Sequence, residues 1–403
     1  MISKVILKSG KDQSAKRFHP WIFSGAIKKI KGEVEEGDIV HVYDNQDNFL
    51  GAGHYQIGTI TVRIITFQDE EIDENFWNKK IEAAYNYRKN LGFTNFFPSL
   101  MEGQGGLDTN VFRLINAEGD GMPGLIIDFY NGTAVMQSHS VGFFKSRDAI
   151  AKSLKQVLGD KLKAVYDKSK ATLPAKAPIN PEDGYFMGES HERIVSENGL
   201  KFKINWEEGQ KTGFFIDQRE NRKLLGKYSS GKTVLNMFGY TGGFSVYALQ
   251  GGAELVHSVD SSKKAIELTN ENIELNFGKT DKHASFAVDA FEYLQTIDNK
   301  YDVIILDPPA FAKHQDALHN ALQGYKKINY SAISQIKKGG ILFTFSCSQA
   351  VSTDAFRKAV FSAAAMSGRH VRIMHQLTQP ADHPVNIYHP EGEYLKGLVL
   401  FVE

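Results

Sequence analysis

The feature that most constrains the fold is an alternation of strand-like and helical segments through the C-terminal half of the chain. Short apolar segments typical of buried strands are separated by segments with helical spacing, and they lie at 233–236, 255–260, 284–288, 302–307 and 341–347. Such alternation predicts an α/β domain with a doubly wound, mostly parallel sheet. Ligands of these sheets bind outside the carboxyl ends of the strands, so the residues that follow each strand become the candidate site.

The N-terminal half has a different pattern. Residues 1–70 contain short β segments punctuated by glycines, and apolar spacing predicts a connecting helix over 74–91. The segment from about 110 to 190 reads as a small α+β domain. Its expected elements are strands at 112–116, 124–129, 133–137 and 162–167, a helix over 144–158, and a loop at 170–184. A β-hairpin is expected within 192–210. We therefore predict three regions, 1–70, 71–190 and 191–403.

Charge and composition exclude several classes of protein. The net charge is +0 at pH 7, which argues against a strongly basic coat for nucleic acid, although residues 1–32 carry eight Lys or Arg against only Asp12. That run is either a solvated face or a local basic surface. The single cysteine excludes an intrachain disulfide and disfavours a Cys-based zinc cluster, so no metal is expected. Without a signal-like or membrane-spanning apolar run, we expect a cytoplasmic protein.

Three strand ends suit a ligand that contains adenosine. The first strand runs into a glycine-rich turn, where Gly239, Gly242 and Gly243 let the backbone approach a ligand closely. The dinucleotide GxGxxG spacing is absent, which disfavours NAD. The second strand ends at Asp260, a position suited to a ribose diol, and the third is followed by Asp289. Each aspartate has a plain structural alternative as a helix N-cap.

The residues at the ends of the fourth and fifth strands are of types that can bind a nucleobase and react with it. Asp307 precedes Pro308 and Pro309, which stop the strand and hold the backbone rigid, and Phe311 follows them. A carboxylate and carbonyls fixed in this way can hydrogen-bond the Watson–Crick edge of an extruded base, and an aromatic ring can stack on it. Cys347 lies at the polar end of the fifth strand between two serines. The alternatives are a strand-ending turn and a buried cysteine that only packs.

At this point the whole chain resembles a known family, the bacterial class I methyltransferases that form 5-methylcytidine in large-subunit ribosomal RNA. The motifs that carry the resemblance occur in family order. They are HPWIFS (19–24), FRLINAEGDGMPGLIID (112–128), GQKTGFFIDQRENR (209–222), LNMFGYTGGFS (235–245), DPPAF (307–311), SCS (346–348), DHP (382–384) and PEGEYLKG (390–397). The resemblance implies an N-terminal PUA domain that binds RNA, a central α+β domain and a Rossmann-like methyltransferase domain with a seven-stranded sheet.

The resemblance also implies that S-adenosylmethionine is the cofactor. Its methionine part would be lined by Phe238, Gly239, Thr241 and Gly243. Asp260 would bind the ribose hydroxyls, Asp289 would face the adenine, and Arg219 would lie near the cofactor carboxylate. Asp307 is expected at the cofactor as well as at the base.

For the substrate, the resemblance implies ribosomal RNA of the large subunit, and relatives suggest a homodimer. Asp307, Pro308, Pro309 and Phe311 would hold the cytosine, and Cys347 would be the nucleophile at its carbon 6. A thiolate adduct there makes carbon 5 reactive enough to accept a methyl group.

The family pattern has two departures in this chain, and two rival functions stay open. Phe18 stands where the PUA motif normally has glycine, and Ala310 leaves no second cysteine beside the prolines, so the group that assists product release is undetermined. One rival is methylation of an exocyclic amine of adenine or guanine, which needs no cysteine. The other is a non-catalytic RNA-binding assembly factor, which would not bind S-adenosylmethionine.

Overall fold

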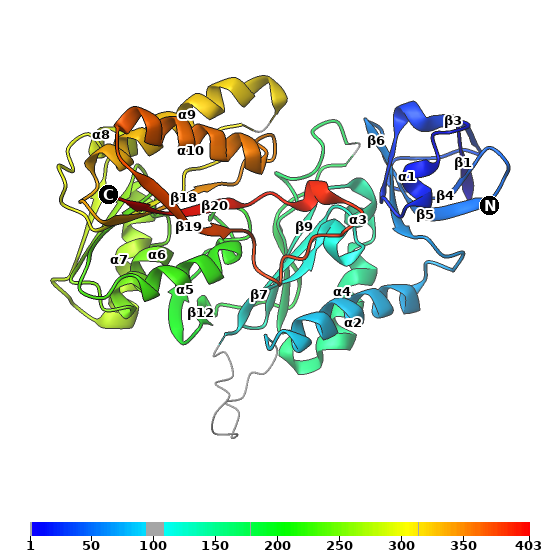
Figure 1. Cartoon of the computed structure of the whole chain (residues 1–403). Coiled ribbons are helices and arrows are strands. Elements are labelled where there is room, and N and C mark those ends of the chain that lie inside the picture. The colour runs from blue at the N-terminus through cyan, green and yellow to red at the C-terminus, as the bar shows by residue number, and fades with distance from the viewer. Residues whose placement is uncertain (1, 94–108, 178, 313) are drawn as a thin grey trace. The chain divides into compact units, whose positions relative to one another are not determined.

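A computed structural model describes residues 2–93, 109–177, 179–312 and 314–403 (Figure 1). The chain divides into two compact units. The first comprises residues 1–199, 204–216 and 381–392, and the second comprises residues 200–203, 217–380 and 393–403. None of the described helices is both long and apolar enough to span a membrane.

The N-terminal part of the first unit is a six-stranded sheet, in agreement with the β-rich pattern of residues 1–70. Its strand order is β2-β6-β5-β4-β1-β3. The elements are β1 (Ser3–Leu7), α1 (Gln13–Lys16), β2 (Trp21–Phe23), β3 (Ile27–Lys31), β4 (Ile39–Tyr43), β5 (Phe49–Tyr55) and β6 (Ile60–Thr66). Alternate strand residues such as Val40 and Val42 are fully buried, and they form a small apolar core with Val5, Leu7 and Val62.

The rest of the first unit is a five-stranded sheet in the order β11-β10-β9-β8-β7, packed against helices. Its elements are α2 (Glu74–Asn90), β7 (Val111–Asn116), β8 (Leu125–Tyr130), β9 (Thr133–Ser138), α3 (Val141–Lys145), α4 (Arg147–Leu158), β10 (Ala164–Asp167) and β11 (Gly184–Met187). The helix expected over 144–158 is therefore two helices that meet at Ser146. The first begins early because the Ser140 hydroxyl accepts a hydrogen bond from the Phe143 backbone N–H.

The expected hairpin is present as β12 (Ile194–Glu197) and β13 (Leu200–Lys203). The second strand ends at Lys203, short of the predicted end of the hairpin at residue 210. The division between the two units falls within this hairpin, at Gly199, and residues 381–392 return to the first unit. The predicted domain boundaries at residues 70 and 190 remain predictions. The two compact units are each made of several separate segments, so they do not correspond to three consecutive regions of the sequence.

The second unit contains a seven-stranded sheet in the order β16-β15-β14-β17-β18-β20-β19. Its strands are β14 (Thr233–Met237), β15 (Leu255–Asp260), β16 (His283–Ala287), β17 (Val303–Leu306), β18 (Gly340–Ser346), β19 (Val371–Leu377) and β20 (Lys396–Val402). The first five strands pair in parallel, whereas β20 is antiparallel to both neighbours. The last strand, β20, begins at Lys396, where a buried apolar run starts.

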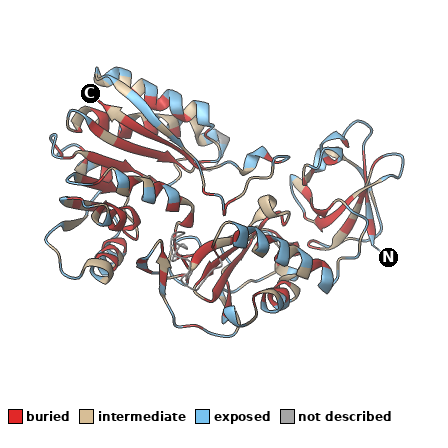
Figure 2. Ribbon diagram, turned by 60° about the horizontal axis from the view of Figure 1, so that its bottom comes forward, coloured by how far each residue is buried: buried red, intermediate tan, exposed pale blue. Residues whose placement is uncertain are grey.

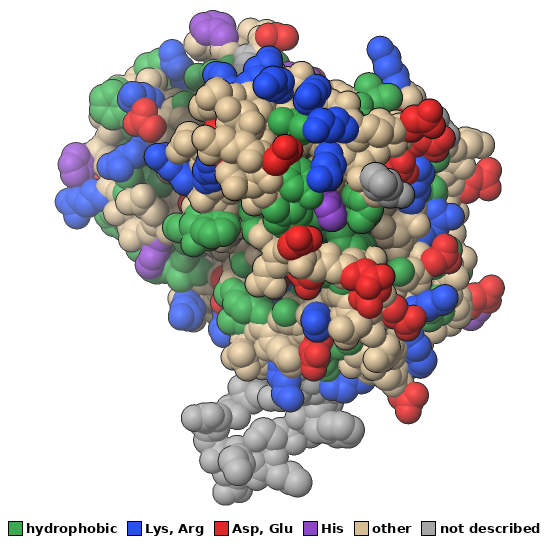
Figure 3. Space-filling view, turned by 90° about the vertical axis from the view of Figure 1, so that its right-hand side faces the viewer, with side chains coloured by type: hydrophobic (Ala, Val, Ile, Leu, Met, Phe, Trp, Pro, Cys, Tyr) green, Lys and Arg blue, Asp and Glu red, His purple; other side chains and the backbone are tan. Residues whose placement is uncertain are grey.

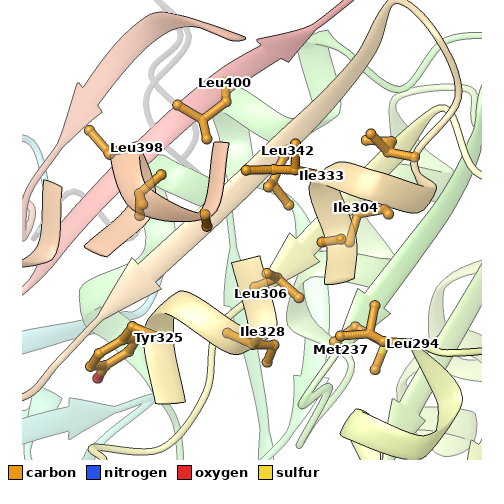
Figure 4. Close-up of a cluster of buried hydrophobic side chains, with 14 of the residues drawn as sticks. Met237, Leu294, Ile304, Leu306, Tyr325, Ile328, Ile333, Leu342, Leu398 and Leu400 are labelled. Atoms are coloured by element: carbon orange, nitrogen blue, oxygen red, sulfur yellow. The ribbon is translucent and has the colours of Figure 1, made fainter. Parts of the chain in front are cut away.

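Helices cover both faces of this sheet. They are α5 (Arg219–Lys227), α6 (Gly243–Gln250), α7 (Lys263–Phe277), α8 (Ala290–Tyr293), α9 (Leu318–Gln335) and α10 (Thr353–Ser367). Consecutive strand residues point to opposite faces, so Ile304 and Leu306 pack with α9 and α10 while Val303 and Ile305 pack with α5 and α6 (Figures 1 and 4). The central strands β14, β17, β18 and β20 are buried almost throughout, the edge strands β16 and β19 are partly or largely exposed, and the helices are exposed on their outer sides (Figure 2). This double cover confirms the predicted α/β class and leaves the strand ends as the accessible edge.

Candidate active site

The turn from β14 into the start of α6, residues 238–243, is called the glycine turn, and its backbone lets a ligand approach closely. Phe238, Tyr240 and Gly242 all have positive φ, at 60°, 45° and 74°, so the backbone reverses within a few residues. The Gly239 N–H donates to the Val259 carbonyl at 3.0 Å, which ties the turn to the neighbouring strand β15. Left-handed backbone is costly for residues with a side chain, and such strain is common at ligand-binding turns.

Helix α7 holds this turn from behind. Thr269 Oγ1 donates to the Tyr240 carbonyl at 2.9 Å, and Asn272 Nδ2 donates to the Thr241 carbonyl at 2.8 Å. A Cβ atom on Gly242 would lie 2.7 Å from Thr269 Cγ2, so only glycine fits there. Sequence reasoning missed both α7 residues. In the sequence, Thr269 and Asn272 stand out only as two polar residues spaced i, i+3. In the structure both are buried on an otherwise apolar face of α7.

Asp260, at the end of β15, is fixed against the same turn. Its Oδ2 accepts the Tyr240 N–H at 3.1 Å and its Oδ1 accepts the Ser262 N–H at 2.9 Å. Each carboxylate oxygen can accept a further hydrogen bond, so the group stays able to bind two vicinal hydroxyls. Binding of a ribose there remains a prediction.

Asp289 caps the N-terminus of a helix, which is the structural alternative to ligand binding given above. It is exposed, and its Oδ1 accepts the backbone N–H groups of Phe291 and Glu292 at 2.8 and 3.1 Å as the N-cap of α8. Its proposed contact with adenine remains a prediction, and Oδ2 is the atom that would make it.

Beneath the turn lies a chain of buried polar groups. Asn236 Nδ2 bonds Ser245 Oγ at 2.9 Å, Ser245 bonds Ser258 Oγ at 2.7 Å, and Ser258 bonds His283 Nε2 at 2.8 Å. Burial lowers the pKa of His283 to about 4, so the ring is neutral at pH 7. Asn236 Oδ1 is a buried acceptor with no partner among the described residues. A cofactor with an ammonium group and a ribose fits this turn, which offers acceptors at Asn236 and Asp260.

Arg219 is the first residue of α5 and is fully buried. It belongs to the same unit as the glycine turn, through the segment that begins at Asp217. Its expected place near a cofactor carboxylate remains a prediction.

Asp307 directly follows β17 and lies in a cluster of polar groups. Gln218 Nε2 donates to its Oδ2 at 3.0 Å, and Tyr394 Oη donates to the neighbouring Asp217 at 2.7 Å. Burial, together with the charge of Asp217, raises the pKa of Asp307 to about 7, against the opposing effects of Gln218 and Arg222. The raised pKa favours the protonated form of the carboxyl group, which can donate a hydrogen bond.

The residues after Asp307 differ in exposure. Pro308 is buried and Pro309 is exposed. Phe311 is half-buried, with its ring 4.7 Å from the ring of Tyr325 and 6.4 Å from that of Phe291. The ring thus already packs within the protein, and only its exposed part could stack on a base, which stays a prediction.

Cys347 directly follows β18 and is half-buried between two buried serines. Ser348 Oγ bonds Tyr325 Oη at 2.9 Å and accepts the Ala312 N–H at 3.3 Å, which fixes the turn after the cysteine to α9 and to the segment after the prolines. The thiol is therefore at the mouth of the sheet rather than inside the core. The side chain also packs against the apolar core on the α5 and α6 side of the sheet, so the role of Cys347 as a nucleophile remains a prediction.

The sheet order brings these groups to one edge. β14 lies between β15 and β17, and β18 follows β17. In the pairing register, Met237 is opposite both Val259 and Leu306, and Leu306 is opposite Thr344. The glycine turn, Asp260, Asp307 and Cys347 all follow these paired positions, so they share the carboxyl edge of the sheet. Gln218, Asp217 and Tyr394 join the site from distant segments; they lie in the motifs at 209–222 and 390–397, but the sequence assigned them no role.

The described residues contain one group with donors suited to a metal ion, in the first unit. Ligand atoms of His19, His389 and Glu391 lie within 4.8 Å of one another. However, His19 Nδ1 accepts the Trp21 N–H at 3.2 Å, so the ring proton is on Nε2, which faces Glu391 at 3.6 Å. This arrangement is compatible with a histidine–carboxylate pair.

The N-terminal sheet carries the basic run of residues 1–32, although residues 33–70 hold only Arg63 against eight Asp or Glu, so a basic RNA-binding surface remains a prediction. All eight Lys and Arg side chains of residues 1–32 are exposed, and three of them, Lys28, Lys29 and Lys31, follow one another along β3. Figure 3 shows many exposed lysine and arginine side chains, with acidic side chains interspersed among them. Such a surface can contact phosphates without reading sequence.

Comparison with protein families finds two matches. Residues 130–390 match the family described as S-adenosylmethionine-dependent methyltransferase, and residues 5–67 match the PUA-like domain family. The second match coincides with the six-stranded sheet, and the first includes the glycine turn, Asp260, Asp307 and Cys347.

Similar proteins cover the whole chain. Ribosomal RNA large subunit methyltransferase I of Alteromonas mediterranea is 39% identical over 99% of this chain and 98% of its own length. The protein of that name from Klebsiella pneumoniae is 37% identical over 98% of each chain. Among solved structures, a candidate S-adenosylmethionine-dependent methyltransferase from Streptococcus mutans has a TM-score of 0.82 at 23% identity and full coverage of both chains. A further candidate methyltransferase, complexed with S-adenosylhomocysteine, has a TM-score of 0.83 at 23% identity with the same coverage.

Proposed function

Because this chain belongs to the S-adenosylmethionine-dependent methyltransferase family, with a PUA-like domain at its N-terminus, we propose that it methylates carbon 5 of a cytosine in large-subunit ribosomal RNA. Relatives of nearly the same length that are named for methylation of this RNA support the substrate class. The observation that carries the choice of base atom is the half-buried thiol of Cys347 at the carboxyl edge, one strand from Asp307.

The cofactor supplies a methyl group on a sulfonium centre. In our proposal the glycine turn of Phe238, Gly239, Thr241 and Gly243 receives its methionine part, with Arg219 near the carboxylate. The Asp260 carboxylate, held by two backbone N–H groups, accepts the ribose hydroxyls, and Asp289 faces the adenine. Rigid acceptors of this kind orient a ligand without having to reorganise when it binds.

The protein's task is to make carbon 5 of cytosine nucleophilic. The Cys347 thiolate adds to carbon 6, and the ring electrons then make carbon 5 enamine-like, so that it can take the methyl group. Loss of the carbon-5 proton to a base and expulsion of the thiolate restore the ring. Asp307, with its pKa raised to about 7, hydrogen-bonds the nitrogen edge and stabilises the protonated adduct.

Delivery of the base involves the rest of the chain. The exposed lysines of the N-terminal domain would contact RNA phosphates, and Pro308, Pro309 and Phe311 would hold a base that is unpaired or flipped out. Such a substrate belongs to the cytoplasm of a bacterial cell, which is where we propose that the protein acts.

The deciding experiment is nucleoside mass spectrometry of unmodified large-subunit RNA after incubation with S-adenosylmethionine. We expect 5-methylcytidine with the native protein and none with Cys347→Ala, while calorimetry shows that both proteins bind the cofactor. A methylated adenosine or guanosine that Cys347→Ala still produces would instead establish the exocyclic-amine activity. Failure of the native protein to bind the cofactor would favour the assembly factor.

Covalent trapping tests the thiol adduct separately. RNA that contains 5-fluorocytidine should form a complex with the native protein that survives denaturation, because fluorine cannot leave carbon 5 as a proton does. Cys347→Ser keeps a small polar side chain at the same position but should not be trapped. Trapping of the serine variant at the native level would contradict the role of the thiol.

A further inference from the structure

Lys396 is a buried lysine that has no role in the methylation mechanism proposed above. It is the first residue of β20 and is only 6% exposed. The antiparallel register sets it opposite Ser346, and its Nζ donates to the Ser348 carbonyl at 2.7 Å. These two contacts are with the residues immediately before and after Cys347. The amine therefore lies across the backbone of the turn that carries the thiol.

The electrostatics of the amine are linked to the thiol. Burial lowers the pKa of Lys396 to about 8, and interaction with Cys347 acts in the opposite direction. Tyr325, from α9, is a further titratable group that interacts with Cys347, and burial raises its pKa, so the phenol is neutral at physiological pH. Lys396 is thus a group near the thiol that can change charge near neutral pH.

We propose that Lys396 takes the proton of the Cys347 thiol and, as an ammonium ion, stabilises the thiolate; this inference rests on the proposed role of Cys347 as nucleophile. The S–H bond breaks, the amine lone pair forms a new N–H bond, and a neutral pair becomes a thiolate–ammonium pair. When the thiolate is later expelled from the base, it returns beside the same ammonium ion. Lys396 acts through the thiol and does not itself attack the substrate, so it is a positioning residue.

The test uses the fact that Cys347 is the only cysteine in the chain. The rate of alkylation by iodoacetamide, followed by intact-protein mass spectrometry from pH 6 to 10, reports the thiolate fraction of this one residue without RNA. The native protein should titrate below the ordinary thiol value of about 8.5. Lys396→Gln, which keeps a hydrogen-bond donor but loses the charge, should raise the apparent pKa by about one unit and slow alkylation at pH 7 about tenfold.

Two further variants separate charge from packing. Lys337→Gln removes a lysine that precedes the opposite end of β18, where its Nζ pairs with Asp302 at 3.0 Å, and it should leave the alkylation profile unchanged. Lys396→Arg keeps a positive charge and should restore a depressed thiol pKa relative to Lys396→Gln. Circular dichroism and cofactor calorimetry confirm that each variant is folded.

Three results would overturn the inference. One is a native thiol that titrates at or above 8.5, a measurement that needs no variant. The second is a Lys396→Gln profile that matches the native one. The third is an arginine variant that behaves as the glutamine variant does. Failure to form 5-methylcytidine alongside the expected alkylation shift would instead refute the proposed function and leave the Lys396–Cys347 pair established.

Discussion

Replacing Gly242 by alanine should destabilise the second unit by two separable effects. Gly242 has a φ of +74°, and left-handed backbone costs a residue with a Cβ about 1–2 kcal/mol. The new Cβ would lie 2.7 Å from Thr269 Cγ2 and 3.2 Å from Thr269 Cα, and forcing an extra methyl into a packed site costs about 1–3 kcal/mol. The expected loss of unfolding free energy is therefore about 2–5 kcal/mol.

Thermal denaturation provides the assay and Gly252→Ala provides the control. A loss of 1 kcal/mol lowers the Tm of a unit of this size by about 2–4 °C, so a loss of about 2–5 kcal/mol in Gly242→Ala should lower it by roughly 4–20 °C. Gly252 has a φ of +84°, but its nearest neighbouring atom would be 3.7 Å from the new Cβ. Gly252→Ala should therefore show only the backbone cost of about 1–2 kcal/mol.

The same variants test whether α7 supports the cofactor turn. If the Thr269 contact is responsible, adding Thr269→Ser, which removes Cγ2 but keeps the hydroxyl that bonds Tyr240, should recover part of the stability. Calorimetry should show weaker cofactor binding for Gly242→Ala and native binding for Gly252→Ala. Equal Tm losses for the two alanine variants would refute the reasoning, because they would mean that α7 moves aside at no cost.

Three further results are expected. Asn272→Ala removes the donor to the Thr241 carbonyl and should lower the unfolding free energy by about 1 kcal/mol and weaken cofactor binding in calorimetry. Asp307 has a pKa of about 7 against an ordinary 3.8, so folding takes up a proton between these values and stability falls as pH rises from 4 to 7; Asp307→Asn should remove that part of the pH dependence of Tm. Arg88 is fully buried against Asp120, and Arg88→Met should cost about 3–5 kcal/mol in denaturant unfolding, because it leaves the carboxylate without its partner.

Local pattern was sufficient for the central strands. The run at 255–260 is β15 with the same bounds, because Val256 and Val259 are fully buried and Asp260 marks the end of the strand. β19 was not predicted, since its sequence mixes His, Arg and Gln and its side chains are largely exposed at the sheet edge. The single helix expected over 144–158 overlooked Ser146, because a break of one residue leaves the helical spacing almost intact.

The candidate site was predictable only where its residues follow their own strands. Asp260, Asp307 and Cys347 were found in this way, because parallel strands deliver their carboxyl ends to a common edge. Gln218 reaches Asp307 from 89 residues away, and nothing in the spacing of either residue indicates the contact. The protonation state of Asp307 depends on that cluster, so the sequence could name the acid but not predict its pKa.

Lys396 also lies at the candidate site although it does not follow a strand, because its own strand, β20, runs in the opposite direction to β18. β20 is antiparallel to β18, so it is the first residue of the strand, not the last, that lies at the carboxyl edge beside Cys347. A search for functional residues that follow the ends of strands therefore misses Lys396, because this residue begins a strand. A lysine at the start of an apolar run also resembles a solvated flank, whereas its amine is buried and bonded to the Ser348 carbonyl. The inserted antiparallel strand thus lets one sheet edge combine the proposed nucleophile from a parallel strand with a buried amine from its neighbour.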